Sequence, residues 1–309
     1  MTRRLLLLVD SRAYARSNCY IGQLCETLAA HYRVRMLSLR EIRYLPLVRP
    51  GSYDRVLSLL RLRTLHANLP RIRKVLGGAP MFVYDQDVWQ SFMDGSPWKG
   101  AYGHILSELN VESFLVTSRW WRDFVAAKGL PVRFVRMGML PRYCDPGPDW
   151  DARPSEVAFQ GTVHPHRRAF FDELARLGLE VELFPSAPYQ AFLANLHAMR
   201  VFVHTEDQPW QVDGVSLRRN ALWIKETEAA ARGTFSIRDH EDEADAYGIA
   251  ELPTILTYRE VREVPGIVAS LRGMPARERR DRMVAAAEAM KRRDDWTTVV
   301  DAIEGRHGA

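Results

Sequence analysis

The sequence predicts an α/β protein with two Rossmann-like, doubly wound domains that face a cleft. Short apolar strand segments alternate with helical segments along the 309 residues, which is typical of parallel sheets covered by helices. The alternation starts again after residues 140–154, where four prolines predict an irregular connection. We therefore expect one domain over residues 1–140, a linker over 141–154 and a second domain from residue 155 onward.

The first half supplies the strands and helices of the first domain. Apolar runs predict strands over Leu5–Asp10, Val34–Leu39, Met81–Tyr84, Glu112–Ser118 and Val132–Gly138. Helices are expected over Gly22–Tyr32, over Tyr53–Leu76 before the stop at Gly77 and Gly78, and from the capping residue Ser118 to Gly129.

The second half repeats the pattern. Strands are predicted over Glu156–Gly161, Val181–Phe184 and Val201–Thr205, helices over Ala169–Leu177 and Tyr189–Ala198, and polar connections over Thr162–Arg168 and Glu206–Arg219. The stretch Leu222–Asp239 then predicts a helix, a stop at Gly233 in the left-handed conformation, and a strand in which Phe235 and Ile237 alternate. Ligands of doubly wound folds bind at the carboxyl ends of the strands.

The composition, with 47% hydrophobic and 26% charged residues, is typical of a soluble globular protein. The apolar run Leu5–Val9 is too short for a signal peptide or a membrane span, so we expect a cytoplasmic protein. The three cysteines, Cys19, Cys25 and Cys144, lack metal-ligand spacing. They predict free thiols and no metal site.

The positive charge is concentrated in the first half. Residues 1–150 carry 22 Lys and Arg against 12 Asp and Glu, whereas residues 151–309 carry 21 against 26. The segment Arg33–Lys74 alone holds eleven basic residues and only two acidic ones. Such a density favours an anionic partner, and a solvated arginine-rich surface explains it equally well.

Several segments resemble the GT-B glycosyltransferases, above all glycosyltransferase family 4 and the spore-maturation-type group. In the first half, FLVTSRWWRDFVAAKGLP resembles the family's strand, Ser, helix and Gly segment. In the second, VAFQGTVHPHRRAFFDEL resembles its strand ending in Gly before a basic turn, and DDWTTVVDAI resembles a closing helix. KETEAAARGTF is similar to the family's Arg-x-Phe-Glu-Ala-x-Ala-x-Gly segment, with Lys225, Glu228 and Gly233 on its marked positions.

The resemblance implies a sugar-nucleotide-binding domain over residues 155–290 and a final helix over 291–309 that returns toward the first domain. The donor-binding residues it implies are Gly161, Arg167, Arg168, Lys225, Glu228 and Gly233. Guanidinium and ammonium groups suit a departing diphosphate, and a glutamate suits ribose hydroxyls. Nucleotide sugar is then the donor substrate, with no cofactor and no metal.

Simpler interpretations exist for the same residues. Arg167 and Arg168 also fit a surface pair at a helix start, Glu228 a solvated helix glutamate and Glu226 its solvent-facing neighbour. One position departs from the family pattern, because Asn220 stands where family 4 carries its first glutamate. The Asp213–Gly214 pair is a candidate replacement.

The predicted acceptor side contains Asp85, Asp87 and His104, which follow the Met81–Tyr84 strand. A carboxylate or imidazole there suits a general base for an acceptor hydroxyl, and His104 fits a structural role as well. Asp85, Gln86 and Asp87 also resemble the metal-binding Asp-x-Asp of GT-A glycosyltransferases. The aromatic residues in this region, which suit either stacking on a sugar or the core, are Trp89, Trp98 and Tyr102.

The predicted activity is transfer of a sugar from a nucleotide diphosphate to an acceptor hydroxyl. The acceptor classes we consider are nucleic acid such as phage DNA, held by Arg33–Lys74, and a metabolite or polysaccharide. A non-catalytic nucleotide- or nucleic-acid-binding protein on the same fold and a sugar-nucleotide epimerase are the alternatives.

Overall fold

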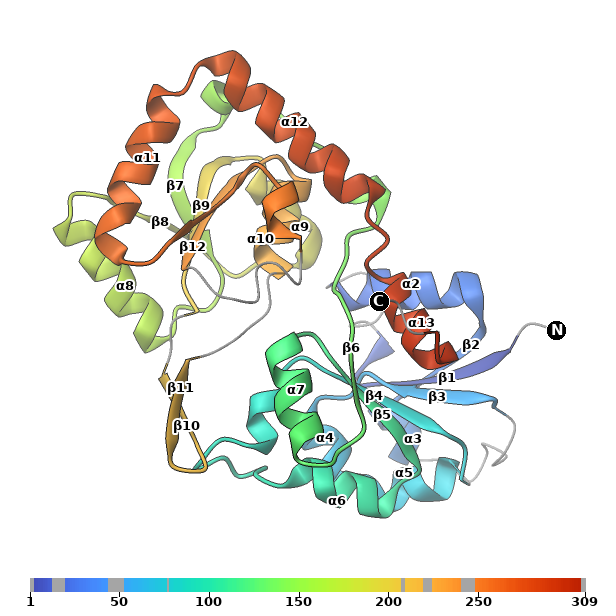
Figure 1. Cartoon of the computed structure of the whole chain (residues 1–309). Helices are drawn as coiled ribbons and strands as arrows, with labels where there is room; N and C mark the ends of the chain where they lie inside the picture. The colour runs from blue at the N-terminus through green and yellow to red at the C-terminus, as the bar shows by residue number, and fades with distance from the viewer. Residues whose placement is uncertain are drawn as a thin grey trace. The chain divides into compact units, whose positions relative to one another are not determined.

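The computed structural model describes residues 3–12, 20–43, 53–76, 78–206, 209–218, 224–239 and 248–306. It divides the chain into two compact units (Figure 1). The first unit consists of Met1–Met137, Trp210–Leu217 and Asp295–Ala309, and the second of Gly138–Pro209 and Arg218–Asp294. Each unit therefore combines segments that are distant in the sequence.

The first unit contains a parallel sheet of six strands in the order β2-β1-β3-β4-β5-β6. The strands are β1 (Arg4–Val9), β2 (Arg33–Ser38), β3 (Arg55–Ser58), β4 (Met81–Asp85), β5 (Val111–Val116) and β6 (Val132–Phe134). The apolar runs of β1 and β4 are buried, as expected for strands covered by helices on both faces. The strand order reverses between β1 and β3, which makes this the place where a ligand site is expected.

Helices and short 3₁₀ turns connect these strands. They are α2 (Ile21–His31), α3 (Leu39–Arg43), α4 (Leu62–Ala67), α5 (Leu69–Leu76), η1 (Val88–Ser91), α6 (Ala101–Glu108), α7 (Arg119–Ala127) and the final helix α13 (Thr297–Glu304). The predicted cap of α7 is confirmed, because the Ser118 hydroxyl accepts the Trp121 amide at 3.1 Å. Helix α13 belongs to this unit, where the Tyr32 hydroxyl donates to Glu304 at 2.7 Å.

The predicted helix over Tyr53–Leu76 is wrong in its first part. Residues Arg55–Ser58 form β3, which lies between β1 and β4, and only Leu62–Leu76 is helical, as α4 and α5. The strand β3 has only two apolar residues, Val56 and Leu57, and is too short to show an alternation, so periodicity does not distinguish it from the helix that follows.

The predicted polar connection over Glu206–Arg219 contains a β-hairpin, formed by β10 (Pro209–Val212) and β11 (Val215–Arg218). Asp213 and Gly214 form its turn with positive φ angles of 52° and 76°, as a two-residue hairpin turn requires. The hairpin packs in the first unit, where the Trp210 ring lies 4.8 Å from that of Trp89. Asp213 pairs there with Lys99 at 3.0 Å and Lys128 at 2.8 Å.

The second unit contains a parallel sheet of five strands in the order β13-β12-β9-β7-β8. The strands are β7 (Ser155–Gln160), β8 (Glu182–Phe184), β9 (Met199–His204), β12 (Phe235–Asp239) and β13 (Ile255–Tyr258). The helices and short turns are η2 (Pro141–Tyr143), η3 (Trp150–Ala152), α8 (Pro165–Arg176), α9 (Tyr189–Leu196), α10 (Ile224–Ala231), η5 (Ile249–Glu251), η6 (Val261–Glu263), α11 (Val264–Gly273) and α12 (Ala276–Arg292). Here the strand order reverses between β7 and β9.

The proline-rich stretch before β7 is irregular, and one arginine holds it to the second unit. Arg153 is 1% exposed. Its guanidinium donates to the carbonyls of Pro146 at 2.7 Å, Met199 at 2.9 Å and Leu196 at 3.0 Å. The buried cation therefore ties the Pro146 carbonyl of this stretch to carbonyls at the end of α9 and the start of β9.

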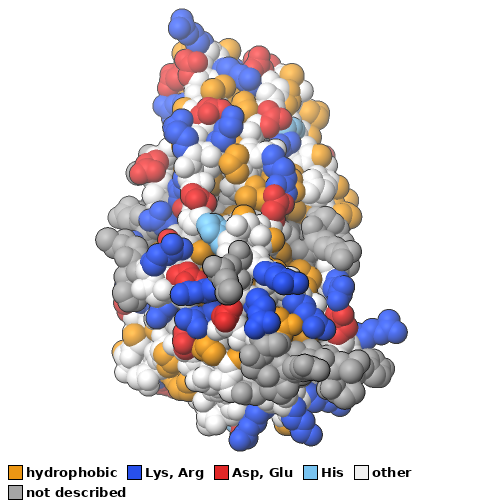
Figure 2. Space-filling view, turned by 90° about the vertical axis from the view of Figure 1, so that its right-hand side faces the viewer, with side chains coloured by type: hydrophobic (Ala, Val, Ile, Leu, Met, Phe, Trp, Pro, Cys, Tyr) orange, Lys and Arg blue, Asp and Glu red, His pale blue; other side chains and the backbone are white. Residues whose placement is uncertain are grey.

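The basic residues of Arg33–Lys74 lie at several places in the first unit. Arg33 and Arg35 stand on β2 and Arg55 begins β3, whereas Arg61 and Arg63 follow the opposite end of β3. The helix α5 carries Arg71, Arg73 and Lys74, and Arg49 lies outside the described residues. Figure 2 shows basic side chains interspersed with acidic ones on one face of the molecule. The described residues of the run thus lie at several separate places in the first unit.

In the described parts of the chain, no helix has the length and apolar character needed to cross a membrane.

Candidate functional site

In the second unit, Lys225 lies directly over the turn that follows β7. Its ammonium group donates to the Gln160 carbonyl at 3.2 Å and lies 4.9 Å from the centre of the Phe159 ring. A β-carbon on Gly161 would be 2.5 Å from the lysine Nζ. Gly161 also has a φ of 148°, which disfavours other residues. The glycine therefore makes room for the cation at the point where the strand order reverses.

Burial changes the acidity of this lysine. Lys225 is half-buried, and burial, together with the nearby charge of Arg167, lowers its pKa to about 8. At neutral pH the side chain is mostly protonated and remains able to bind an anion. Its charge becomes sensitive to pH just above neutrality.

The two predicted arginines of the basic turn lie in different environments. The turn is shorter than predicted, because α8 begins at Pro165 and includes both residues. Arg167 is 6% exposed, pairs with Glu206 at 2.5 Å and donates to the Thr162 carbonyl at 2.8 Å. Arg168 is exposed, and its guanidinium has no partner among the described residues.

A buried network of charges lies beneath Lys225. His204, the last residue of β9, contacts Glu226 through Nδ1 at 2.6 Å and Glu206 through Nε2 at 3.0 Å. Arg238 lies 3.4 Å from the other oxygen of Glu226. The expectation that Glu226 faces solvent is wrong, since this residue is 0% exposed. Burial acts to raise the Glu226 pKa, but the charges of Arg238 and His204 lower it overall.

Glu228 is the second predicted residue on α10 and lies one helical turn after Lys225. It is 3% exposed, so it is no solvated surface glutamate. Burial raises its pKa to about 8 despite a hydrogen bond from Tyr189. Its Oε1 atom has no hydrogen-bond partner within the part of the chain that the structure describes. A buried acceptor without a donor is costly, and a ligand hydroxyl would satisfy it.

Gly233 lies at the other end of α10, where it ends the helix as predicted, with a φ of 61°. The Thr234 amide donates to the Ala229 carbonyl at 2.8 Å, and a β-carbon on Gly233 would be 2.5 Å from the Pro146 carbonyl oxygen. Its observed contacts are structural. Asn220 lies outside the described residues, and Asp213 belongs to the hairpin of the first unit.

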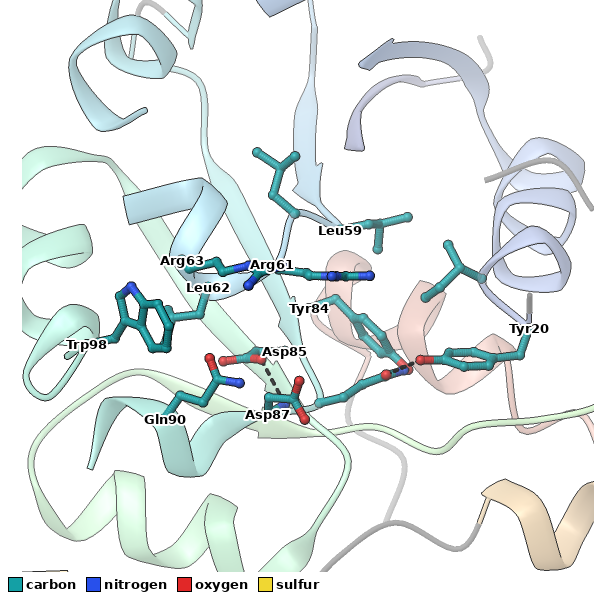
Figure 3. Close-up of a pocket in the computed structure, with 13 residues that line it drawn as sticks. Tyr20, Leu59, Arg61, Leu62, Arg63, Tyr84, Asp85, Asp87, Gln90 and Trp98 are labelled. Atoms are coloured by element: carbon teal, nitrogen blue, oxygen red, sulfur yellow. Dashed lines mark hydrogen bonds between the residues drawn. The ribbon is translucent and has the colours of Figure 1, made fainter. Parts of the chain in front are cut away.

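The first unit has a pocket of about 350 Å³ at the ends of β3 and β4 and the start of α2, close to the place where its strand order reverses. The lining residues used below are Tyr20, Arg61, Arg63, Asp85, Gln86, Asp87, Gln90 and Trp98. In Figure 3 the arginine side chains lie on one side of the pocket and the two aspartates on the other. The pocket therefore combines opposite charges.

Asp85 and Asp87 meet in this pocket as predicted from their position after the strand. The Asp85 carboxylate accepts the Asp87 amide and the Tyr102 hydroxyl, each at 2.9 Å. Burial and the neighbouring Asp87 charge raise the Asp85 pKa to about 7. Two carboxyl groups that share one site in this way hold a proton near neutral pH, as acid and base chemistry requires.

His104 does not line the pocket. It is exposed on α6, where its Nδ1 atom lies 2.8 Å from Nε2 of His66 on α4. Of the three aromatic residues considered from the sequence, Trp98 lines the pocket. Tyr102 is buried and stacks on Phe114 with ring centres 3.9 Å apart.

The sequence did not single out His204 or Glu206, and Gln86 stood out in it only as the middle residue of the Asp-x-Asp pattern. His204 and Glu206 follow from the position of their strand end, because the carboxyl ends of β7 and β9 are neighbours in the sheet. Gln86 lies between the two predicted aspartates and accepts a hydrogen bond from the Tyr20 hydroxyl.

No protein-family model and no curated protein sequence matches the chain. Solved structures match it along its whole length. HepE from Anabaena, in complex with UDP and glucose, has a TM-score of 0.64 at 13% identity, with 98% of each chain covered. T4 phage BGT, in complex with its UDP-glucose substrate, has a TM-score of 0.63 at 9% identity, covering 97% of this chain and 99% of its own.

A third structure, an α-glucosyltransferase in complex with UDP and a 13-mer DNA containing an HMU base, has a TM-score of 0.60 at 9% identity. That match covers 98% of this chain and 99% of the other. At such identities the likeness shows the fold. The chain has the GT-B fold that the resemblance of its segments implied, and the GT-A alternative is wrong.

Proposed function

We propose that the protein is a glycosyltransferase that moves a sugar from a nucleotide diphosphate to an acceptor hydroxyl. The observation that carries this proposal is the Lys225 ammonium group over Gly161, with the unsatisfied Oε1 atom of the Glu228 carboxyl group one helical turn away. A cation beside a strand-end glycine suits a diphosphate, and a buried acceptor suits a ribose hydroxyl. The UDP and UDP-glucose ligands of HepE and T4 phage BGT support the donor class.

In this proposal the second unit binds the donor. Lys225 and the exposed Arg168 contact the diphosphate, and the first turn of the twelve-residue helix α8 adds backbone amides. Arg167 acts indirectly, because its guanidinium holds Glu206 beside His204. Glu228 accepts a hydrogen bond from ribose. Since cations of the chain neutralise the diphosphate, the scheme uses no metal.

The first unit supplies the acceptor site and the base. Asp87 lines the pocket and is half-buried, so an acceptor can reach it, whereas Asp85 is only 7% exposed. Asp87 therefore removes the proton of the acceptor hydroxyl. The oxygen forms a bond to the anomeric carbon, the bond from that carbon to the diphosphate breaks, and the electron pair leaves with the nucleoside diphosphate. His104 is not assigned the role of base, because it lies beside His66 outside the pocket lining.

A panel of sugar nucleotides tests the activity. The purified protein is incubated with each donor, and release of nucleoside diphosphate is measured with and without mixed acceptors. Glu228→Ala and Lys225→Met should weaken nucleotide binding, while Asp172→Asn, an exposed change on α8, should not. Binding without any product would identify a non-catalytic nucleotide-binding protein, and no binding to any nucleotide would refute the donor site.

A further inference from the structure

The pocket of the first unit contains two arginines whose positive charge the proposed sugar transfer does not use. Arg61 and Arg63 flank the start of α4 and line the pocket opposite Asp85 and Asp87 (Figure 3). Both side chains are exposed. Arg61 is held beside Asp10, because its guanidinium forms an ion pair with that carboxylate at 3.8 Å and its backbone amide donates to it at 3.3 Å.

Arg63 has no ion-pair or hydrogen-bond partner among the residues that the structure describes. A guanidinium has five donors in a planar fork that fits the oxygens of a phosphate or a carboxylate. At a pocket mouth, such a group is available to a ligand.

The acidic side of the pocket suits the reacting hydroxyl of an acceptor, and its basic side suits an anionic group of the same molecule. The aspartates suit a neutral hydroxyl that gives up a proton, and they repel an anion placed next to them. The arginines attract an anion on the other side of the same space. A volume of about 350 Å³ is at the small end of ligand sites and fits one sugar-sized group with one anionic substituent.

We propose that the acceptor is a small polyhydroxyl compound carrying one oxyanion group, a phosphate or a carboxylate, which Arg63 and Arg61 bind while its reacting hydroxyl faces Asp87. The proposal rests on the proposed glycosyltransferase activity and names its acceptor class.

Nucleic acid held by Arg33–Lys74 is the rival acceptor, and the positions of the described basic residues of this segment argue against it. A strand of nucleic acid contacts several phosphates along a continuous basic track. Here Arg33, Arg35 and Arg55 lie at the amino ends of β2 and β3, and only Arg61 and Arg63 lie at the pocket. Among the described residues of Arg33–Lys74, Arg61 and Arg63 therefore provide a local anion site.

Matched acceptors test the proposal with the full chain. Glucose, glucose phosphate, glucuronic acid and a single-stranded DNA oligonucleotide are compared as acceptors, with the sugar nucleotide that the panel identifies. We expect kcat/KM for the phosphate or the uronic acid to exceed that for glucose by about tenfold or more, since a charged hydrogen bond is lost with the neutral sugar.

Arg63→Met should remove this preference by raising KM for the anionic acceptor, with little change for glucose. Arg63→Lys should restore it in part, because an ammonium group keeps the charge and loses the fork. Arg40→Met is the matched control, since Arg40 is an exposed arginine of the same unit that does not line the pocket. Slow hydrolysis of the donor in the absence of acceptor should be equal in all four proteins.

Three outcomes would overturn the proposal: equal use of neutral and anionic sugars, an equal effect of Arg63→Met on both, or a preference for DNA that falls steeply with salt. Calorimetric binding of glucose phosphate to the parent protein and to Arg63→Met needs no turnover. It therefore tests the anion site even if no sugar nucleotide is a donor, and separates failure of this proposal from failure of the proposed activity.

Discussion

The ammonium nitrogen of Lys225 lies 2.5 Å from the position that a β-carbon on Gly161 would occupy. The two residues are 64 positions apart and meet because β7 and α10 end and begin at the same edge of one sheet. The position of the Lys225 ammonium group therefore requires a glycine at position 161, because any side chain there would occupy the same space. This relationship makes the donor site testable by substitution on either side.

Gly161→Ala should move the Lys225 side chain and weaken binding of a nucleoside diphosphate by about tenfold, the size of a lost charged hydrogen bond. Calorimetry measures the affinity. Gly178→Ala is the control, because Gly178 also has a positive φ but a β-carbon there would meet no atom within 4 Å. Unchanged affinity in Gly161→Ala would show that Lys225 does not bind the nucleotide.

Binding of the nucleotide should weaken as the pH rises through about 8. The folded pKa of Lys225 is lowered to about 8 by burial, so the lysine is charged below this pH and neutral above it. Lys225→Arg should keep the binding without this pH dependence, because a guanidinium stays charged. A parent affinity that is constant from about pH 7 to about pH 9 would contradict the assignment.

Glu228 should make the folded protein less stable as the pH rises from about 4.5 to about 8. Its pKa is raised from 4.5 to about 8 by burial, so in this range the folded state holds a proton that the unfolded state has released. Urea unfolding of the parent and of Glu228→Gln at several pH values measures the effect as a difference in slope. The variant should show the flatter dependence, and identical slopes would mean that Glu228 is ionised in the folded state.

Replacing Gly233 at the C-terminal end of α10 should lower the free energy of unfolding more than replacing Gly178 at the C-terminal end of α8. Both glycines end a helix with positive φ, and both are followed by an amide that bonds back into the helix. Gly178→Ala should cost about 1 kcal/mol for the left-handed backbone. Gly233→Ala should cost about 3 kcal/mol, because its β-carbon also meets the Pro146 backbone at 2.5 Å. Equal losses in thermal or urea unfolding would show that the linker moves away without cost.

Asp87→Asn should abolish transfer to an acceptor and leave nucleotide binding unchanged, since the amide cannot take a proton. In the parent protein, transfer should increase as the pH rises through about 7, where Asp85 ionises and strengthens Asp87 as a base. His104→Gln is the control and should retain transfer. Loss of transfer in the histidine variant with retention in Asp87→Asn would reverse the assignment of the base.

The alternation of strands and helices was readable because parallel strands such as β1 and β4 are continuous apolar runs with polar loops behind them. Local rules also predicted the Ser118 cap and the Gly233 stop, since both depend on neighbouring residues alone. The same reasoning placed Asp85 and Asp87 at a strand end, where the structure has its pocket.

Other features depend on contacts between distant segments and left no local signal. The strand β3 is short and buried on both faces, and the β10–β11 hairpin is formed by residues that looked like a polar loop. The burial of Arg167 and Glu226 follows from His204, Glu206 and Arg238, which come from other elements. A charged side chain is predicted to be exposed from the sequence alone, because its burial requires a partner of opposite charge that comes from a distant segment.

The interleaving of the two units has a consequence for the order in which the protein forms during synthesis. The second unit is complete once Asp294 has emerged from the ribosome, because its last segment ends there. The first unit, although it starts at Met1, lacks its hairpin until Leu217 and its final helix until Asp295–Ala309 has been made. The unit whose translation starts first is thus the one finished last, and a premature stop that removes α13 would damage the N-terminal half.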